Sequence, residues 1–153
     1  MEGKVKIPFF QRTYVWNEEN WEDLIEELFS DKTNNFLGTI ILKQMQTASG
    51  EPKCHEVIDG QQRLTTLSIL LKALYDTFTP ELQENCKGDV WGPLFSRKDF
   101  VSAEYEIKIE HSQVDANAYQ SVMQANIDNN PPLEHVNEKS HRIMQCYKYF
   151  LTE

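Results

Sequence analysis

Apolar residues recur at the spacing of a helix surface in two long segments. The first segment carries them at positions i, i+3, i+4, i+7 and i+8, namely Trp21, Leu24, Ile25, Leu28 and Phe29. Asn17, just before this pattern, is a preferred N-cap residue, and the helix dipole favours the acidic Glu18 and Glu19 that follow it. The pattern therefore predicts a helix from Asn17 to near Ser30, with one apolar face toward the core.

The second segment is longer and more apolar. Its main stripe consists of Leu64, Leu67, Leu71, Leu74 and Phe78, and it is widened by Ile69, Leu70 and Ala73. An apolar surface of this width predicts a helix over residues 61–78, ended by Pro80, that is buried on more than one side and lies at the centre of the domain. Two further helices are expected, one capped by Ser112 or Asp115 and one from about Asn137 onward.

Other segments carry the residue types of strands. Residues 4–16 are expected to be extended, because Pro8 disfavours the helical conformation of the residue before it. Residues 36–45 and 55–59 are apolar runs separated by turn residues, which predicts an antiparallel hairpin. Residues 105–110 alternate apolar and polar side chains, as in a strand with one solvated face. This mixture of helices and strands predicts an α+β (mixed) fold.

Composition places the chain among ordinary globular domains. It has 153 residues, of which 40% are hydrophobic and 25% charged. No segment approaches the run of about 18 apolar residues that crosses a membrane, so no membrane association is expected. The N-terminus lacks the apolar core of a signal peptide, and the three cysteines have no disulfide or zinc spacing. Together these features predict a cytoplasmic protein with free thiols.

Charge narrows the candidate chemistry. The net charge of −9 argues against an electrostatic grip on DNA by the whole surface. Acidic residues gather between Glu18 and Glu27, where a solvated helix face is expected. The segment from Lys4 to Arg12 is basic by contrast. Within the same segment, the aromatic side chains are expected in the core; they are Phe9, Phe10, Tyr14 and Trp16.

The candidate chemistry lies at the start of the central helix. Residues 57–67 are predicted to form a buried strand, a one-glycine turn and the first turn of the helix. Such a junction directs free N–H groups and the positive end of the helix dipole toward one place, which suits an anion. Arg12 and Arg63 add forked donors that match phosphate oxygens, and Gly60 lets the backbone come close. The alternative is a simple turn with Asp59 or Gly60 near the N-cap.

The other polar residues of this region admit more than one role. Asp59 is a candidate for holding a divalent cation against phosphates, for orienting a water molecule, or for capping the helix. Gln61 and Gln62 are neutral amides, which suits the positioning of an attacking water. Thr65 and Thr66 either offer hydroxyls to a ligand or bond back to the helix.

Three motifs carry a family resemblance: Ile7-Pro8-x-x-Gln11-Arg12-x-Tyr14-x-Trp16, then Phe36-Leu37-Gly38-Thr39-Ile40-Ile41-Leu42, then Val57-Ile58-Asp59-Gly60-Gln61-Gln62-Arg63-Leu64-Thr65-Thr66-Leu67. With these motifs the chain resembles the domain-of-unknown-function family 262. That family provides the N-terminal domain of GmrSD-type modification-dependent restriction enzymes and of related phage-defence proteins. The likeness is strong over residues 4–78 and continues more weakly through His111-Ser112-x-x-Asp115, Tyr119 and Tyr147-x-x-Phe150.

The resemblance implies a ParB/sulfiredoxin-like fold, a small sheet with packed helices followed by C-terminal helices. It divides the chain into a nucleotide-binding domain at residues 1–110 and a helical extension at 111–153. It implies a module that binds and hydrolyses a nucleoside triphosphate (NTP) with Mg²⁺. The nucleotide-binding residues it implies are Gln11, Arg12, Gly38, Thr39, Asp59, Gly60, Gln62, Arg63, Thr65 and Thr66. Those implied for catalysis are Asp59, Gln61, Gln62 and Arg63, with Asp59 as the Mg²⁺ ligand.

The same resemblance leaves other functions open. Members of the family usually continue into a helical region and an HNH-type nuclease domain, so DNA is an expected partner of the full-length protein. The nuclease domain is missing from this sequence, and DNA cleavage by this part alone is not expected. One alternative is a non-enzymatic DNA-recognition module that uses the same polar groove. The other is a metal-dependent nuclease within this domain. The preferred nucleotide, the DNA modification that is sensed and a homo-oligomeric state stay open.

Overall fold

The computed structural model describes residues 3–30, 36–50, 52–97, 105–127, 132–133 and 136–152. The strands are β1 (Lys4–Lys6), β2 (Ile41–Gln44), β3 (Cys54–Asp59), β4 (Phe95–Arg97), β5 (Tyr105–Ile107) and β6 (Ile109–Glu110). The helices are α1 (Glu18–Phe29), α2 (Gln61–Thr77), α3 (Pro80–Asn85), η1 (Lys87–Trp91), α4 (Gly92–Leu94), α5 (Gln113–Gln124) and α6 (Arg142–Thr152).

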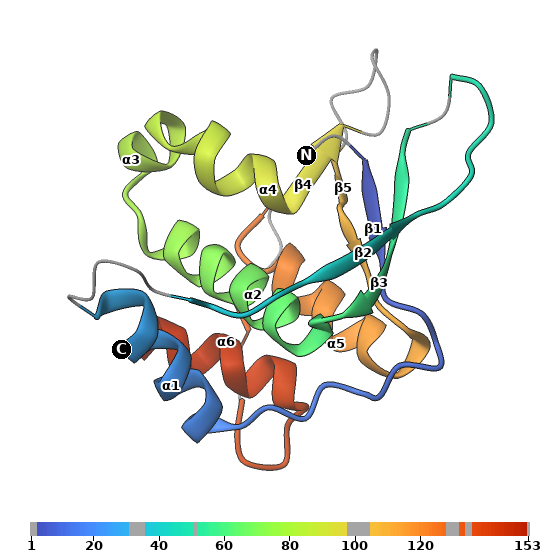
Figure 1. The fold of residues 1–153 in the computed structure, drawn as a ribbon. Helices are drawn as coiled ribbons and strands as arrows, with labels where there is room; N and C mark the ends of the chain where they lie inside the picture. Colours follow the sequence, from blue (N-terminus) through green and yellow to red (C-terminus); the bar gives the residue numbers. More distant parts are fainter. Residues whose placement is uncertain are drawn as a thin grey trace.

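A four-stranded sheet has the order β2-β3-β1-β6. The neighbours β2 and β3 are antiparallel, as the sequence predicts for this hairpin, whereas β1 is parallel to both β3 and β6. Val5 therefore lies opposite His55 on one side and Ile109 on the other. A separate antiparallel pair is formed by β4 and β5 (Figure 1). This sheet with its packed helices confirms the predicted α+β fold.

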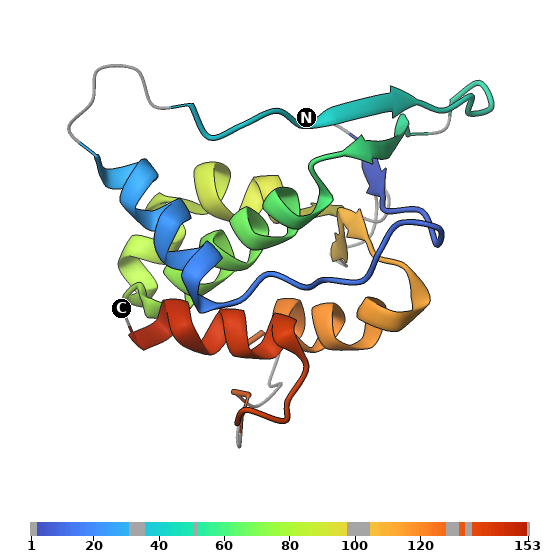
Figure 2. The same cartoon turned by 60° about the horizontal axis from the view of Figure 1, so that its bottom comes forward.

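Helix α2 lies in the middle of the molecule, as its apolar width predicts (Figure 1). Helices α5 and α6 pack beside it, and the extended segment after β1 runs between α2 and these two helices (Figure 2). Residues 8–16 of that segment are called the arm below. Within the described part of the chain, no helix is long and apolar enough to cross a membrane. One core cluster joins Val57 and Ile69 with Val122 and Ile143, so α5 and α6 share the core with the sheet.

Local signals set the ends of α1 as the sequence predicts. The Asn17 side chain accepts a hydrogen bond from the Asn20 N–H at 3.4 Å, and the Asn20 side chain accepts one from the Asn17 N–H at 3.1 Å. This reciprocal pair satisfies N–H groups that would otherwise have no partner at the helix start. The helix ends at Phe29, next to the predicted Ser30. Phe29 itself is 77% exposed, contrary to the predicted apolar face, because it lies in the final turn of the helix.

Two apolar segments differ from the sequence prediction. Phe9 and Phe10 were expected in the core, yet they are 86% and 67% exposed. The chain turns there, since the Gln11 N–H bonds to the Pro8 carbonyl at 3.1 Å, and the two rings pack against each other outside the core. The strand expected over residues 36–45 is confined to β2, because Gly38 has a φ of 88° and departs from strand geometry.

Further differences concern element boundaries. The strand expected over residues 105–110 divides at Lys108 into β5 and β6, which belong to different sheets. The Lys108 N–H donates to the Leu94 carbonyl, and the Lys108 carbonyl accepts from the Val5 N–H. Lys108 therefore connects the two sheets. The last helix begins at Arg142 rather than near Asn137. The residues between form a turn in which the Asn137 N–H donates to Ser140 Oγ. Residues 31–35 and 128–131 lie outside the described residues.

The buried face of α2 is more polar than its sequence predicts. Its fully enclosed residues include Thr65, Thr66, Ser68 and Lys72, whereas Leu74 from the predicted apolar stripe is 41% exposed. Each of these buried polar groups has a partner inside the fold: Tyr14 or Gln62 for Thr66, His111 for Thr65, Tyr119 for Ser68, and Asp76 for Lys72. Because hydrogen-bonded partners offset the cost of burying a polar group, α2 can present a polar face to the core.

Candidate functional site

The junction between β3 and α2 has the geometry of an anion site. Gly60 is the N-cap residue of α2, with a left-handed φ of 87°, and no side chain among the described residues caps the helix. A Cβ atom at this position would lie 2.7 Å from the Thr39 carbonyl oxygen, so only glycine fits. The N–H groups of the first turn therefore point outward without side-chain acceptors. Asp59, the last residue of β3, is exposed beside them.

Asp59 does not cap the helix. One of its carboxylate oxygens accepts a hydrogen bond from the adjacent Gly60 N–H at 2.8 Å, and Gly60 occupies the N-cap position. Of the alternatives that the sequence leaves open for Asp59, the geometry retains cation binding and water orientation. Its exposed position leaves the second carboxylate oxygen accessible to either ligand.

The arm is attached to this junction by amide side chains. Gln11 donates to the Ile58 carbonyl at 3.1 Å, and Gln61 donates to the Arg12 carbonyl at 2.9 Å. Gln62 uses both ends of its amide, because it donates to the Thr13 carbonyl at 3.0 Å and accepts from the Val15 N–H at 2.9 Å. Two neighbouring glutamines of the helix thus hold the backbone of the arm over the first turn of α2.

Arg63 lies on one flank of this first turn. Its guanidinium lies against Gly38, where a Cβ atom would be 2.3 Å from Arg63 Cζ. It also donates a long hydrogen bond to the Thr39 carbonyl at 3.4 Å and lies 6.0 Å from the centre of the Trp16 ring. Trp16, Gly38 and Arg63 border an open cavity of 340 Å³. Its other wall is the acidic face of α1, including Asp23. Arg63 is therefore held loosely, with donors left for a ligand.

Arg12 lies on the opposite flank. It is exposed, and its guanidinium makes no hydrogen bond or ion pair with the described residues. It borders a narrow polar recess with Gln61, Thr65 and Asp115. Because successive residues of a helix are rotated by about 100°, Gln61 and Arg63 face nearly opposite directions from the axis. The structure thus brings the predicted residues to one helix start but divides them between two flanks, with Asp59 and Gly60 at the tip.

The predicted hydroxyl residues lie deeper. Thr66 is fully buried and donates to the Gln62 carbonyl at 2.8 Å, which is one of the two roles that the sequence leaves open. The Tyr14 hydroxyl lies 2.7 Å from Thr66 Oγ1. The same Tyr14 hydroxyl accepts a hydrogen bond from the Trp21 indole N–H at 2.9 Å. Burial raises the pKa of Tyr14 far above its ordinary value, so it stays a neutral phenol. Thr65 is equally buried.

Sequence reasoning gave no role to Asp115 at this site. Its side chain is buried at 3% exposure, and one oxygen accepts from the Tyr14 N–H of the arm at 2.9 Å. The other oxygen lies 3.2 Å from His141 Nε2, in the range of an ion pair, but accepts no hydrogen bond from the described residues. Asp115 thereby connects the arm to α5 and α6. The sequence indicates Asp115 as a candidate helix cap and as part of the weaker family resemblance, and neither signal points to the arm.

Comparison with known proteins bears on this arrangement. The sequence profile of the family described as "GmrSD restriction endonuclease, N-terminal domain" matches residues 1–152. The chain belongs to this family. The expected resemblance is thus confirmed, and the chain is called the GmrSD-type domain below.

One curated relative of the GmrSD-type domain is much longer than this chain. The chain is 24% identical over 157 residues to the uncharacterized protein MJ0686 of Methanocaldococcus jannaschii. The alignment covers 90% of this chain and 25% of that relative. The chain thus spans about a quarter of the length of the relative.

The polar groups of the GmrSD-type domain fit a Mg²⁺ ion that is bound jointly by the protein and by phosphate oxygens of a ligand. No group of three or more His, Cys, Asp or Glu side chains within the described ranges forms a site that would hold a metal ion. Mg²⁺ in nucleotide enzymes is commonly bound by one or two carboxylates together with phosphate oxygens and waters. The exposed carboxylate of Asp59 at the helix start matches that requirement.

A substitution at Gly38 tests how Arg63 is positioned. In Gly38→Ala, the new Cβ would overlap the Arg63 guanidinium and displace this flexible side chain, while the positive φ adds a strain of about 1 kcal/mol. If the chain binds an NTP, as the family resemblance implies, we expect that binding to weaken about tenfold with a small loss of thermal stability. Gly50→Ala is the matched control, because Gly50 also has a positive φ but its Cβ would meet open space. Equal NTP affinity of Gly38→Ala and Gly50→Ala would contradict the role of Gly38 in positioning Arg63.

His111 makes the fold sensitive to acid. Burial, and secondly the neighbouring His141, lower the pKa of His111 to about 4 from its ordinary value of 6.5. Unfolding between these two pH values takes up a proton, so acid favours the unfolded chain. We expect His111 to lower the free energy of unfolding by about 1.4 kcal/mol per pH unit as the pH falls through this window. Urea denaturation of the wild type and His111→Gln measures the difference, and parallel pH profiles would exclude this effect.

Proposed function

We propose that the GmrSD-type domain is a Mg²⁺-dependent NTP-binding and hydrolysing module of a DNA-restriction protein. The observation that carries the proposal is the start of α2, which no described side chain caps and which two guanidinium groups flank. Outward N–H groups and a helix dipole favour negative charge, and arginine forks match phosphate oxygens. The glycine at the N-cap allows phosphates to approach the backbone closely.

The two flanks define how a phosphate chain is held. Arg12 and Arg63 approach from opposite sides of the first turn, so a polyphosphate laid across the turn reaches both. The cavity beyond Arg63 is lined by the acidic Asp23 on α1, which disfavours phosphate there. The phosphates therefore belong over the N–H groups of α2 rather than inside that cavity. Asp59 would hold Mg²⁺ against them, and the bound ion would neutralise charge on the phosphate oxygens.

The two glutamines take different roles in this proposal. Gln62 has both ends of its amide occupied by the arm, so we assign it to holding the arm. Gln61 uses its NH₂ group on the Arg12 carbonyl, while its Oε1 atom is buried and accepts no hydrogen bond from the described residues. A free amide oxygen next to an anion site is suited to orient an attacking water. The recess beside this oxygen has no room for a water, so the arm must shift before a water reaches it. With that shift, Gln61 is the proposed water-positioning residue.

The role in restriction concerns the whole protein. The family description names a restriction endonuclease, and this chain spans about a quarter of its curated relative. We infer that DNA cleavage belongs to another part of the full-length protein and that this module supplies nucleotide-dependent control. The net charge of −9 counts against the alternative in which the isolated module recognises DNA by itself.

Isothermal titration tests this function. ATP, GTP, CTP and UTP are titrated into the chain with and without Mg²⁺, and phosphate release is followed in parallel. We expect at least one NTP to bind, to bind more tightly with Mg²⁺, and to lose that Mg²⁺ dependence in Asp59→Asn. A folded chain that binds none of the four would refute the proposal. Salt-dependent binding of DNA that persists in Asp59→Asn would instead support a DNA-recognition module.

A further inference from the structure

A second cavity lies toward the other end of α2. Tyr75, which lines it, is four helical turns beyond Gln61, or about 20 Å at 1.5 Å per residue. The cavity volume is 590 Å³, within the range of roughly 300–1,000 Å³ of small-molecule sites. It shares no lining residue with the proposed phosphate site, so that site does not explain it.

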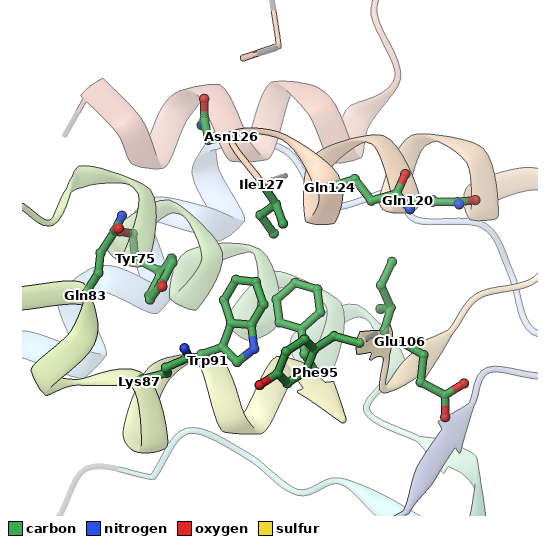
Figure 3. Close-up of a pocket in the computed structure, with 12 residues that line it drawn as sticks. Tyr75, Gln83, Lys87, Trp91, Phe95, Glu106, Gln120, Gln124, Asn126 and Ile127 are labelled. Carbon is green, nitrogen blue, oxygen red and sulfur yellow. The ribbon is translucent and has the colours of Figure 1, made fainter. Parts of the chain in front are cut away.

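One wall of this cavity is aromatic. The Trp91 ring is stacked on Phe95 with centroids 4.1 Å apart and lies 5.2 Å from the Tyr75 ring. Tyr105 meets the same indole edge-on at 5.8 Å. Figure 3 shows Trp91 and Phe95 side by side, with Ile127 facing them from across the cavity. Rings of this kind offer a flat planar ligand a large contact surface.

The same wall carries a hydrogen-bond donor without an acceptor. The Trp91 Nε1 atom is buried and has no hydrogen-bond partner among the described residues. Buried indole N–H groups normally find a partner, because leaving one unpaired is costly. Because the nitrogen is enclosed, an acceptor atom on a bound ligand would satisfy it once the indole tilts toward the cavity. This favours a polar heterocycle over a purely apolar ligand such as a hydrocarbon chain.

The facing wall supplies amides. The side chains of Gln120 and Gln124 on α5 make no hydrogen bonds with the described residues. Asn126 adjoins them with a left-handed φ of 59° and is fixed there because its NH₂ group donates to Asp76 and to the Tyr147 hydroxyl. Amide side chains combine donor and acceptor and are the groups that pair with the edges of nucleobases.

Charge at the cavity suits a phosphate-bearing ligand. Glu106 is paired with Lys4 at 2.8 Å, so its negative charge is balanced. Lys87 is half-exposed and lies 3.7 Å from an exposed glutamate, Glu84, a separation at which a surface pair is weak. Its ammonium group therefore remains accessible to an anion. The cavity thus combines a flat aromatic wall, amide edges and a nearby cation.

We propose that this cavity binds a nucleobase, with its ring on the aromatic wall and an acceptor atom on Trp91 Nε1. Base-aromatic contact is the general means by which proteins hold unpaired bases. The same chemistry comes from two sources, a free nucleotide or an unpaired base of DNA. The proposal goes beyond the NTP module, since the two sites share no residue and each stands if the other fails.

Binding measurements on the 153-residue chain test the proposal. The probes are the adenosine, guanosine, cytidine and thymidine monophosphates, with ribose 5-phosphate as the probe that lacks a base. The variants are Trp91→Phe, which keeps a ring but removes the N–H, and Gln124→Ala, which changes an exposed amide on the facing wall. We expect a monophosphate to bind, and each variant to weaken that binding about tenfold. Arg142→Ala, which changes an exposed arginine that lines neither cavity, should leave it unchanged.

A binding experiment with DNA distinguishes the two sources of the base, a free nucleotide and DNA. A duplex with one unpaired base is compared with a fully paired duplex, again with both variants. Preference for the unpaired base that depends on Trp91 and Gln124 identifies DNA as the source, and binding of monophosphates alone identifies free nucleotides. The proposal is overturned if no base-bearing probe binds. It is also overturned if ribose 5-phosphate binds equally well, or if binding is the same in the wild type and in both variants.

Discussion

Replacing Arg63 with alanine is expected to weaken Mg²⁺-NTP binding by roughly 10- to 100-fold, the value of a charge-assisted hydrogen bond of about 1.5–3 kcal/mol. The fold should survive, because the partners of the guanidinium are a long hydrogen bond to Thr39 and a distant contact with Trp16. Arg63→Lys should recover only part of the binding, since an ammonium group lacks the planar fork that matches phosphate. Isothermal titration with a non-hydrolysable NTP measures the loss.

Arg142→Ala is the matched control for this change. Arg142 is an exposed arginine at the start of α6, on an element that does not line the phosphate site. Arg142→Ala removes the same charge as Arg63→Ala, so any effect of net charge alone appears in both variants. Arg63→Ala and Arg142→Ala with equal NTP affinity would contradict the proposed role. A large fall in the melting temperature of Arg63→Ala would instead identify the arginine as a structural residue.

Asp76→Ala is expected to cause the largest loss of stability. Lys72 and Asp76 form an ion pair whose side chains are 0% and 3% exposed. The same Asp76 oxygen also accepts from Asn126 and from the Tyr147 hydroxyl. Removing the carboxylate leaves the Lys72 ammonium buried, with the Ala125 carbonyl as its only acceptor among the described residues. The expected cost is about 3–5 kcal/mol, measured by urea denaturation near neutral pH.

The pH dependence of Asp76→Ala distinguishes a buried charge from a packing defect. Burial lowers the pKa of Lys72, and Asp76 opposes that effect. Without Asp76 the lysine pKa falls further below its unfolded value, so unfolding takes up a proton at any pH between those two values. The deficit should shrink as the pH rises toward the ordinary lysine pKa of about 10.4. A deficit that is independent of pH, or one that Lys72→Met does not reduce in the double variant, would contradict this explanation.

Local signals explain what the sequence predicts well. Asn17 caps α1 because its side chain needs only a neighbour three residues away. The hairpin of β2 and β3 follows from apolar runs separated by turn residues. Gly60 lies between strand and helix because its conformation is closed to other residues. Each of these features depends on residues close in sequence, so the pattern alone is sufficient.

Long-range pairing explains what the sequence does not predict. The leucine stripe of α2 indicates one buried face, yet the buried residues include Thr66 and Lys72. Their partners, Tyr14 and Ala125, come from more than 50 residues away along the chain. Spacing within one helix carries no information about such partners. Phe9 and Phe10 show the opposite error, because a turn rather than hydrophobicity decides that they face outward.

The candidate site has some features that local sequence predicts and others that depend on long-range contacts. The sequence places Asp59, Gly60 and Arg63 at the start of α2, and the structure has them there. It does not indicate that Arg63 packs on Gly38 while Arg12 lies by Gln61, on the other flank. That division follows from the rotation of successive residues around α2 and from the path of the arm. It also leaves Asp115, which binds the arm backbone, without a signal in local sequence.

The most direct test observes the backbone at the start of α2. In an NMR titration of the ¹⁵N-labelled chain with a non-hydrolysable NTP and Mg²⁺, the amide signals of residues 60–63 should shift most strongly. At the same NTP concentration, Arg63→Ala should strongly reduce these shifts, and ribose 5-phosphate should not produce them. If the NTP binds while these signals stay in place, or shifts only residues that line the aromatic cavity, the phosphate site at α2 is contradicted.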